Sequence, residues 1–558
     1  MPPSVAINYN AGFKTTGTKL MGANAAAEGF LRAYLRFSGD TTFHAIVESD
    51  EAAAAFQQEV QQFAPNPATP IKVYPRALTA PLAAVGCVYN EDPVFSSQAW
   101  QRRWEGDTAY SLCGITHTTC TQTVLDAFSQ LVTAPFQAWD AVICTSQSVR
   151  STVDQVLESW TGYLAERLGV THRPAVELPV IPLGIDCDQF AAQAADPLPR
   201  KSWRAVLGIG ENDIAFLFFG RLSYHGKANP LAMYRALEMA ARKTSRKLHL
   251  ILAGWFANDT LEAHFREAAA AFCPSVKLSV VDGRRQDVRR QIWNAADIFT
   301  SLSDNIQETF GLTPVEAMAA GLPAVISDWD GYRETVRHGV DGFRIATTIA
   351  PAGHGDVFMR RHFLNVDNYD RYIGHTSHFT AVDIPQAAAA YAALVDNADL
   401  RKKLGASARQ RAREVFDWRV IIGRYQELWA ELNRRRAVAA AKPQPPRAMP
   451  HPLRPDPFTL FAGYATSPLA DDTLLAAAPD ARDEFIQVMH QAPMLQYMGH
   501  PSLIASVEEM RAIFAALQTS PQPVAQVIQP YPVNQHVKLR LSLVWMLKMG
   551  LLVRQFPG

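Results

Sequence analysis

The 558-residue sequence has no uninterrupted apolar run of about 18 residues, the length that a membrane-spanning helix needs. Its start, MPPSVAINYN, lacks the charged-then-apolar pattern of a signal peptide. We therefore expect a cytoplasmic protein with no integral membrane segment. The six cysteines include no C-x-x-C pair, which favours reduced, mostly buried thiols over a disulfide framework or a zinc site.

The sequence also lacks net charge, with 53 basic and 53 acidic residues, but the charges are unevenly distributed. Residues 1–200 carry 12 basic and 19 acidic side chains, whereas residues 201–436 carry 32 and 26. The second region is therefore the better host for an anionic ligand. Residues 457–558 carry 6 basic and 7 acidic side chains, so they lack the excess positive charge that nucleic-acid binding needs.

Short apolar runs alternate with segments of helical periodicity between residues 201 and 340. The expected strands are AFLFFG (215–220), LHLILAG (248–254), DIFTSLS (297–303) and PAVISD (323–328), and the expected helices cover 229–245, 259–272 and 288–296. This alternation predicts a parallel doubly wound α/β sheet with ligands at the carboxyl ends of its strands. Residues 1–190 repeat the pattern less regularly.

Two glutamates, Glu308 and Glu316, flank a short helix start in ETFGLTPVEAMAAGLP (308–323). Thr313-Pro-Val-Glu316 fits a capping box, with Thr313 as N-cap, proline at the first helical position and Glu316 reaching back to the cap. On local physics alone this structural role explains Glu316. It does not explain Glu308.

The Phe310-Gly311-Leu312 turn and two cations suggest a binding role. Gly311 lets the backbone approach a ligand closely, and amides at the helix start can donate to phosphate or sugar oxygens. Arg221 and Lys227 follow the expected strand at 215–220, where a forked guanidinium and an ammonium suit a diphosphate. Both loops follow strands of one expected sheet, so we expect them to form one anion-binding site.

Residues 306–343 resemble the signature of the retaining glycosyltransferases of family 4, which have the GT-B fold of two facing Rossmann-like domains. Supporting matches are GRLSYHGK (220–227), IPLGIDCDQF (181–190), ICTSQSVR (143–150), ILAG (251–254) and EVFDWRVIIGRYQELW (414–429). The resemblance covers about residues 1–435 and is most specific in the second half. It departs at Pro182-Leu183-Gly184, where the family has asparagine in the middle.

The resemblance implies a role for each matched residue. Glu308 should bind the transferred sugar, Glu316 the ribose hydroxyls, and Arg221 with Lys227 the diphosphate. Near the start of the chain, GFKTTGTKLMGAN (12–24) resembles the glycine loop that approaches the donor, and His117 in GITHTTC resembles the active-site histidine. The implied donor-binding set is Gly22, Arg221, Lys227, Glu308, Phe310, Gly311, Leu312, Thr313 and Glu316, and the implied catalytic set is Glu308, His117, Arg221 and Lys227.

We expect no metal and no cofactor beyond the nucleotide-sugar substrate. Asp328-Trp329-Asp330 has the D-x-D pattern of the other glycosyltransferase fold, but no further ligand cluster lies near it in the sequence. We interpret it as a loop with a turn at Asp330-Gly331.

The domain organisation follows from these patterns and from a proline-rich stretch, Lys442 to Pro457, in which seven of sixteen residues are proline. We expect an N-terminal Rossmann-like acceptor-side domain (1–195), a donor-binding Rossmann-like domain (196–418), a terminal helix crossing back to the first domain (419–436), a linker (437–457), and a small, mostly helical module that resembles a winged helix (458–558). We expect this module to bind a protein partner or to present a substrate. Its expected core consists of Val537, Leu539, Leu541, Leu543, Val544, Leu547 and Leu551.

The resemblance therefore implies a retaining, metal-independent hexosyltransferase that moves a sugar from a nucleoside diphosphate sugar to an unidentified acceptor hydroxyl. One alternative keeps the fold but changes the reaction to sugar-nucleotide epimerisation. Another is a degenerate transferase that acts as a nucleotide-sugar binding subunit. Retention of Arg221, Lys227, Glu308 and Glu316 together argues against the degenerate alternative.

Overall fold

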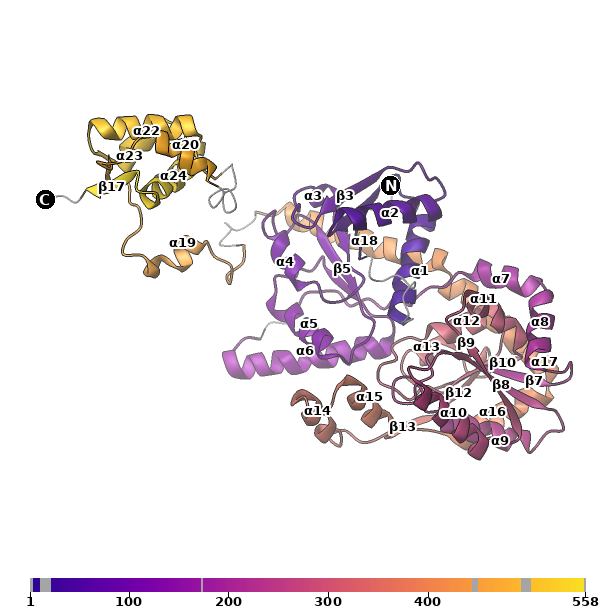
Figure 1. The fold of residues 1–558 in the computed structure, drawn as a ribbon. Coiled ribbons are helices and arrows are strands. Elements are labelled where there is room, and N and C mark those ends of the chain that lie inside the picture. Colours follow the sequence, from indigo (N-terminus) through magenta and orange to yellow (C-terminus); the bar gives the residue numbers. More distant parts are fainter. Residues whose placement is uncertain (1–3, 11–21, 172–173, 444–449, 493–502, 556–558) are drawn as a thin grey trace. The chain divides into compact units, whose positions relative to one another are not determined.

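The computed structural model describes residues 4–10, 22–171, 174–443, 450–492 and 503–555. The chain forms two compact units, Met1–Pro450 and His451–Gly558. Within the described residues, the first unit contains two parallel six-stranded sheets with helices on both faces (Figure 1). This confirms the predicted fold class, α/β with two Rossmann-like sheets as in the GT-B fold.

The first sheet has the strand order β3-β2-β1-β4-β5-β6 and every pairing in it is parallel. Its strands are β1 (Ala6–Asn8), β2 (Phe43–Val47), β3 (Ile71–Pro75), β4 (Cys87–Tyr89), β5 (Ser111–Ile115) and β6 (Ala141–Ile143). The helices around it are α1 (Gly22–Phe37), α2 (Asp50–Phe63), α3 (Leu82–Val85), α4 (Ser96–Arg102), α5 (Gln122–Thr133) and α6 (Gln147–Leu168). Tyr89 and its neighbour Val88 pack in different core clusters because successive side chains of a strand point to opposite faces.

The second sheet has the order β12-β11-β10-β7-β8-β9 and is also parallel. Its strands are β7 (Ile214–Phe219), β8 (Leu248–Gly254), β9 (Val276–Asp282), β10 (Ile298–Ser301), β11 (Ala324–Ser327) and β12 (Gly342–Ile345). The four strands that the sequence predicts here correspond to β7, β8, β10 and β11. The prediction missed β9, an edge strand whose half-buried residues break the continuous apolar pattern of the central strands.

Helices surround the second sheet. They are α7 (Cys187–Ala195), α8 (Leu198–Leu207), α9 (Pro230–Ala241), α10 (Asp259–Phe272), α11 (Gln286–Gln291), α12 (Leu312–Ala320), α13 (Tyr332–Thr335), α16 (Ile384–Asp396) and α17 (Ala398–Arg411). Of the three helices predicted here, the one at 259–272 has the predicted bounds, and the one at 229–245 ends four residues early. The helix expected at 288–296 splits into α11 and a 3-10 turn, Ile292–Ala295. A short antiparallel pair, β13 (Thr347–Ile349) and β14 (Thr380–Val382), carries the insertion α14 (Asp356–Phe363) and α15 (Tyr369–Ser377).

The chain passes from one sheet to the other twice, and the two crossing segments pair with each other. The Ile185 amide donates to the Phe416 carbonyl at 2.8 Å, and the Trp418 amide donates to the Ile185 carbonyl at 3.0 Å. The helix that follows, α18 (Trp418–Ala440), packs on α1 beside the first sheet, where Tyr425 and Trp429 are buried against Tyr89. The last helix of the unit therefore belongs to the core of the first sheet.

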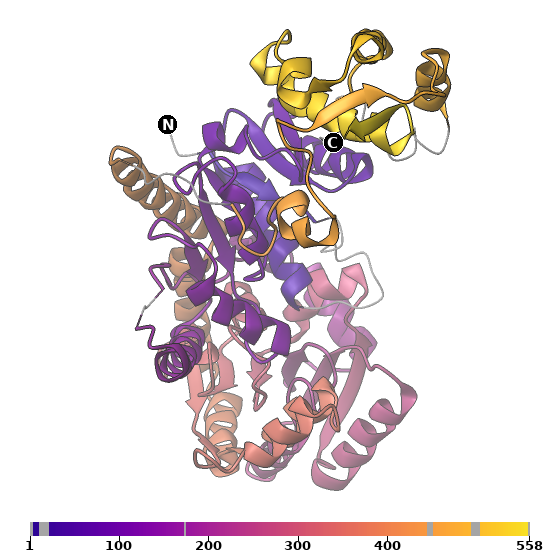
Figure 2. The ribbon, with the colours of Figure 1, turned by 90° about the vertical axis from the view of Figure 1, so that its left-hand side faces the viewer.

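The second unit packs helices on a short antiparallel sheet of order β16-β15-β17 (Figure 2). Its elements are α19 (Pro457–Leu460), β15 (Leu474–Ala477), α20 (Glu484–Gln491), α22 (Val507–Thr519), β16 (Gln522–Pro523), α23 (Val524–Ile528), α24 (His536–Lys548) and β17 (Leu552–Gln555). Of the predicted core, Leu539, Leu543 and Leu551 are fully buried and Leu541 and Leu547 are partly buried.

The prediction is wrong for Val537 and Val544, which are 71% and 48% exposed. These valines are seven residues apart and so share one face of α24. The buried residues Leu539, Leu543 and Met546 occupy another face of the same helix.

We expect a protein that ends at Pro450 to fold and to bind a nucleoside diphosphate as the full chain does. Each unit has its own apolar core, and all predicted donor-site residues lie in the first. Circular dichroism and nucleotide titration of the shortened and full proteins would check this. Loss of cooperative unfolding in the shortened protein would show that the second unit completes the core of the first.

Candidate functional site

The loops after β7 and β10 meet at the carboxyl end of the second sheet, because these strands are neighbours. Lys227 comes from the first loop and Glu308 from the second, and the Lys227 Nζ lies 2.9 Å from the Glu308 Oε2. Two further bonds join the loops: Asn305 Nδ2 donates to the His225 carbonyl at 2.6 Å, and Ser303 Oγ donates to the Lys227 carbonyl at 3.2 Å. The predicted cation and carboxylate are therefore held in contact.

Glu308 is ionised although its side chain is only 11% exposed. Burial alone raises the pKa of its carboxyl, but the ion pair with Lys227 and the amides of Thr309 and Phe310 outweigh burial and leave the pKa below its ordinary value. The site thus keeps a nearly buried negative charge beside a cation that remains one-third exposed.

Arg221 lies in the same loop as Lys227, two residues after the end of β7. Its Nη2 donates to the Gly226 carbonyl at 3.1 Å, and a Cβ added at Gly226 would lie 2.6 Å from that nitrogen. Glycine at 226 therefore lets the loop fold closely around the guanidinium. Its guanidinium makes no other hydrogen bond to the part of the chain that the structure describes, so the remaining donors can bind an anion in the loop.

Gly311 has a left-handed backbone conformation, with φ 92° and ψ 80°, immediately before α12. A Cβ there would lie 2.1 Å from Cε1 of Tyr332, whose hydroxyl is 2.9 Å from Ser301 Oγ. Its neighbour Phe310 is buried and packs edge-to-face with Phe416. The turn is thus fixed on both sides, and only glycine fits at 311.

Replacing Gly311 by alanine is expected to destabilise the protein by at least about 1–3 kcal/mol, since it adds backbone strain and a clash with Tyr332. Thermal or urea unfolding would measure the loss. Gly162→Ala is a matched control, because Gly162 lies in the interior of α6 with no heavy atom within 4 Å of an added Cβ. This control should stabilise slightly, and equal effects of the two substitutions would contradict the packing argument.

The predicted capping box at Thr313 to Glu316 is wrong. The N-cap of α12 is Gly311, no side chain caps the helix, and Leu312 is already its first residue. The left-handed Gly311 starts the helix before Thr313, which therefore has helical geometry and is unable to act as the cap. Glu316 needs another explanation.

Glu316 is partly buried, and no hydrogen bond to its carboxylate occurs among the residues that the structure describes. Burial raises the pKa of Glu316 to about 7, and the charge of Arg289 opposes that shift only in part. A half-buried carboxyl that neither caps its helix nor pairs with a cation is suited to accept hydrogen bonds from a ligand's hydroxyl groups.

His117 and Gly22 lie on the first sheet's side of the unit. His117 follows β5, its Nε2 lies 2.7 Å from the Glu91 carbonyl, and burial lowers its pKa, so the ring is neutral. Gly22 is the first residue of α1, and an added Cβ would meet no heavy atom within 4 Å. The remainder of the predicted glycine loop, residues 12–21, lies outside the described residues.

The two halves of the unit touch beside these residues. The Sγ of Cys120, three residues after His117, lies 3.1 Å from the Tyr369 hydroxyl, and that hydroxyl donates to Gln307 Oε1 at 3.3 Å. Tyr369 therefore connects the histidine loop to the residue before Glu308. Sequence reasoning missed this tyrosine, because it belongs to an insertion between β13 and β14 that was not predicted.

The Asp328-Trp329-Asp330 loop forms a turn before α13, as the sequence predicts. Asp330 has φ 44°, and its carbonyl accepts from the Arg333 amide at 3.2 Å. Burial and the charge of Glu308 raise the pKa of Asp330 well above its ordinary value. In the described part of the chain, no group of three or more His, Cys, Asp or Glu side chains is placed to hold a metal ion.

Glu334, just after this loop, makes a second contact between the halves. Its Oε1 accepts from the backbone amide of Gln147, the first residue of α6, at 2.6 Å. Helix N-termini favour negative charge, so this carboxylate stabilises the contact. Sequence reasoning missed Glu334 because its partner is a backbone group 187 residues away.

Both loops of the candidate site lie within a region that matches a known protein family. Residues 199–352 match the model of the family "Glycosyl transferases group 1". The chain is 31% identical over 167 residues to D-inositol 3-phosphate glycosyltransferase of Geodermatophilus obscurus, covering 29% of this chain and 35% of that protein. It is 25% identical over 294 residues to the enzyme of the same name from Thermobispora bispora, covering 51% and 58%. The chain thus spans about a third of the length of the first curated relatives it matches.

Among solved structures, Anabaena Alr3699/HepE in complex with UDP is 18% identical, with a TM-score of 0.49, covering 76% of this chain and 99% of that one. Sucrose-phosphate synthase from Thermosynechococcus elongatus is 16% identical, with a TM-score of 0.46, covering 78% and 99%. Across the described residues, no helix is long and apolar enough to span a membrane.

Proposed function

We propose that this protein is a glycosyltransferase that moves a sugar from a nucleoside diphosphate sugar to an acceptor hydroxyl, with retention of configuration and without a metal ion. The observation that carries the proposal is the Lys227–Glu308 pair, which adjoins Arg221 at the carboxyl ends of β7 and β10. The match of residues 199–352 to the group 1 family supports it. The first donor base to test is uracil, since the Anabaena protein is described with UDP.

In this proposal each residue acts through its charge or its hydrogen bonds. Arg221 and Lys227 bind the diphosphate and neutralise the charge that develops as it leaves. Glu308 orients the sugar, and Glu316 accepts hydrogen bonds from the ribose. Catalysis then consists mostly of positioning and of electrostatic stabilisation of the leaving group.

The remaining predicted residues complete the proposed site. The amides around Gly311 to Thr313 approach the sugar and phosphates, and the neutral ring of His117 faces the sugar from the first half. Gly22 belongs to the loop that approaches the donor. The acceptor enters from the side of the first sheet.

A thermal-shift comparison of UDP, GDP and ADP tests the proposal directly. A nucleotide that binds the folded state should stabilise it by about 2.7 kcal/mol at a hundredfold excess over Kd. The absence of any shift with all three nucleotides, together with no hydrolysis of nucleotide sugars, would overturn the proposed function.

Arg221→Ala is expected to weaken nucleoside diphosphate binding about ten- to a hundredfold, because it removes a charge-assisted hydrogen bond of roughly 1.5–3 kcal/mol. Isothermal titration of the variant and the wild type would measure this. Arg235→Ala is a matched loss of charge, since Arg235 is exposed on α9, outside both loops. Unchanged affinity in the Arg221 variant, or an equal loss in the Arg235 control, would remove Arg221 from the site.

A further inference from the structure

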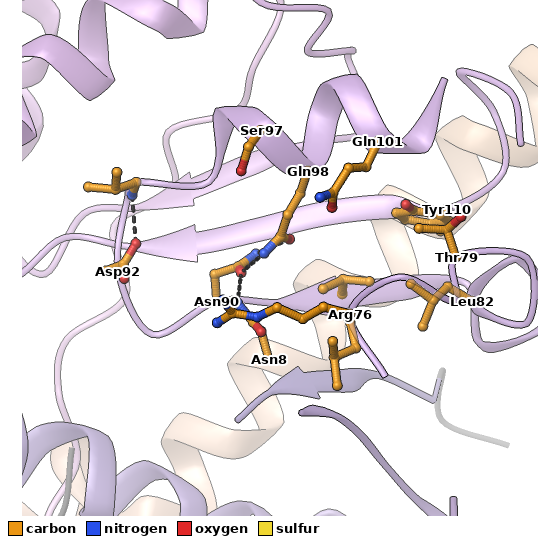
Figure 3. Close-up of a pocket in the computed structure, with 13 residues that line it drawn as sticks. Asn8, Arg76, Thr79, Leu82, Asn90, Asp92, Ser97, Gln98, Gln101 and Tyr110 are labelled. Atoms are coloured by element: carbon orange, nitrogen blue, oxygen red, sulfur yellow. Dashed lines mark hydrogen bonds between the residues drawn. The ribbon is translucent and has the colours of Figure 1, made fainter. Parts of the chain in front are cut away.

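A polar cavity of about 190 Å³ opens in the first sheet's half of the unit, between α4 and the strands beneath it (Figure 3). None of the predicted donor-site residues lines it. Gln98 and Gln101 reach into it from α4, while Asn8 is the last residue of β1 and Asn90 directly follows β4. The cavity is therefore a separate feature of the molecule.

A network of side-chain amides forms one wall of this cavity. Asn90 is only 2% exposed; its Nδ2 donates to Gln98 Oε1 at 3.0 Å, and its Oδ1 accepts from Gln98 Nε2 at 2.6 Å and from Asn8 Nδ2 at 2.8 Å. A longer bond from Asn90 Nδ2 to the Cys113 carbonyl, at 3.5 Å, completes the two donor and two acceptor positions of this amide, which therefore holds Asn8 and Gln98 in place. Among the residues that the structure describes, Asn8 and Gln98 make no other side-chain hydrogen bond, so each keeps an amide N–H and acceptor capacity. Asn90 is therefore a positioning residue for both.

Gln101 adds a further amide on the same face of α4, one turn after Gln98. Its side chain makes no hydrogen bond within the described ranges and points toward the strand side of the cavity (Figure 3). An amide offers two donor hydrogens and two acceptor lone pairs. The wall therefore presents neutral donors and acceptors close together. Sugar hydroxyl groups match this arrangement, because each hydroxyl can both donate and accept a hydrogen bond.

The charges around the cavity argue against an anionic ligand. Arg76 is the cation that lines it, and its guanidinium already pairs with Glu48. Asp92 also lines the cavity, and its Oδ1 accepts from the Val94 amide at 2.7 Å. Glu48 already balances Arg76, and Asp92 adds a further negative charge, so the cavity has no positive field to attract a phosphate.

The size and floor of the cavity fit one sugar ring. Its volume is smaller than the roughly 300–1,000 Å³ of sites for drug-sized ligands, so a nucleotide is too large. Ile46, Leu82 and Val88 supply an apolar floor. A pyranose or cyclitol presents a C–H face to such a floor while its hydroxyls meet the amides.

We propose that this cavity binds a neutral sugar or cyclitol ring, a binding site that goes beyond the proposed transfer reaction. The loop of residues 90–92 joins it to the candidate reaction centre, because the Glu91 carbonyl lies 2.7 Å from His117 Nε2. The ligand has two sources, a sugar residue of the acceptor or a free sugar that is not consumed. Both share the chemistry that the amide wall recognises.

Saturation-transfer NMR on the full-length protein tests the proposal with D-glucose, D-galactose and myo-inositol as probes and glucose 6-phosphate as the anionic comparator. We expect at least one neutral probe to bind, and Gln101→Ala and Asn8→Ala to weaken its binding about five- to tenfold. Gln58→Ala is the matched control, because Gln58 is exposed on α2 outside the cavity. It should leave binding unchanged.

No binding of any neutral probe, preference for glucose 6-phosphate, or equal binding by all variants would overturn the site. The same samples are titrated with UDP. A protein that binds UDP but no neutral sugar disproves this sugar site alone, whereas a protein that binds no nucleotide disproves the proposed function. Adding UDP-glucose then separates the two sources. A probe converted to a new glycoside is an acceptor, whereas a probe that binds unchanged is a free ligand, and either result upholds the site.

Discussion

Alanine in place of Lys227 is expected to lower both nucleoside diphosphate affinity and the stability of the free protein. The substitution removes the cation 2.9 Å from the nearly buried Glu308 carboxylate. Loss of this charge-assisted bond costs roughly 1.5–3 kcal/mol of stability, and the diphosphate loses a partner of similar strength. Turnover falls with it, because Glu308 loses its fixed position.

The pH dependence of unfolding separates this effect from a simple loss of charge. In the wild type, the lowered pKa of Glu308 contributes stability above the ordinary value of 4.5, and this stability is lost as pH falls through the folded-state pKa. Without Lys227, burial raises the pKa of Glu308, so the carboxylate costs stability at neutral pH. The difference in melting temperature between wild type and variant should therefore grow as pH rises from acid to neutral.

A second substitution provides the control for Lys227. Adding Glu308→Gln to Lys227→Ala removes the unpaired charge, so stability at neutral pH should largely return. Donor affinity and turnover should remain low, because the Lys227 contact is still absent and the Glu308 carboxylate is now absent as well. If the double variant is as unstable as the single one, the ion pair is not the source of the loss.

Glu316→Gln is expected to weaken donor binding by about 1–3 kcal/mol with little change in melting temperature. Because the helix is capped at Gly311 without a side chain, Glu316 has no capping role that the substitution could disturb. The change replaces a charged acceptor pair with one neutral acceptor and an NH2 donor facing the ribose hydroxyls. A variant with wild-type donor affinity would exclude Glu316 from the nucleotide site.

The affinity of the wild type should also depend on pH through Glu316. Burial raises its pKa to about 7, whereas ribose hydroxyls donate to the carboxylate, so binding favours loss of the proton. Donor affinity should therefore rise with pH up to about 7 and then level off. Titrations of both proteins with a nucleotide sugar would show this slope in the wild type and its absence in Glu316→Gln.

The sequence predicted the features of the fold that depend on local pattern. Continuous apolar runs located the central strands β7, β8, β10 and β11, because strands buried on both faces have no polar alternation. The edge strand β9 was not predicted, because its half-buried and exposed residues interrupt the continuous apolar pattern. The face of α24 was also misjudged, since valines at 537 and 544 alone do not reveal which side of a helix meets the core.

The candidate site was predictable where it follows strand ends and less so where it depends on distant contacts. The adjacency of Lys227 and Glu308 followed from two strands expected in one sheet. The helix start at Gly311 did not, because a left-handed glycine before α12 outweighed a sequence that fits a capping box. Tyr369 and Glu334 make contacts across the two halves, and nothing in their local sequence indicates those partners.

The paired crossing segments at Ile185 and Asp417 determine how the two sheets can move against each other. Because the segments are hydrogen-bonded together, a bend at this place would involve both of them at once. Such a bend would carry α18 with the first sheet, although α18 follows the second sheet in the sequence. Any separation of the two halves would break the bonds from Gln147 to Glu334 and from Cys120 to Tyr369, so these bonds favour the arrangement in which the halves touch.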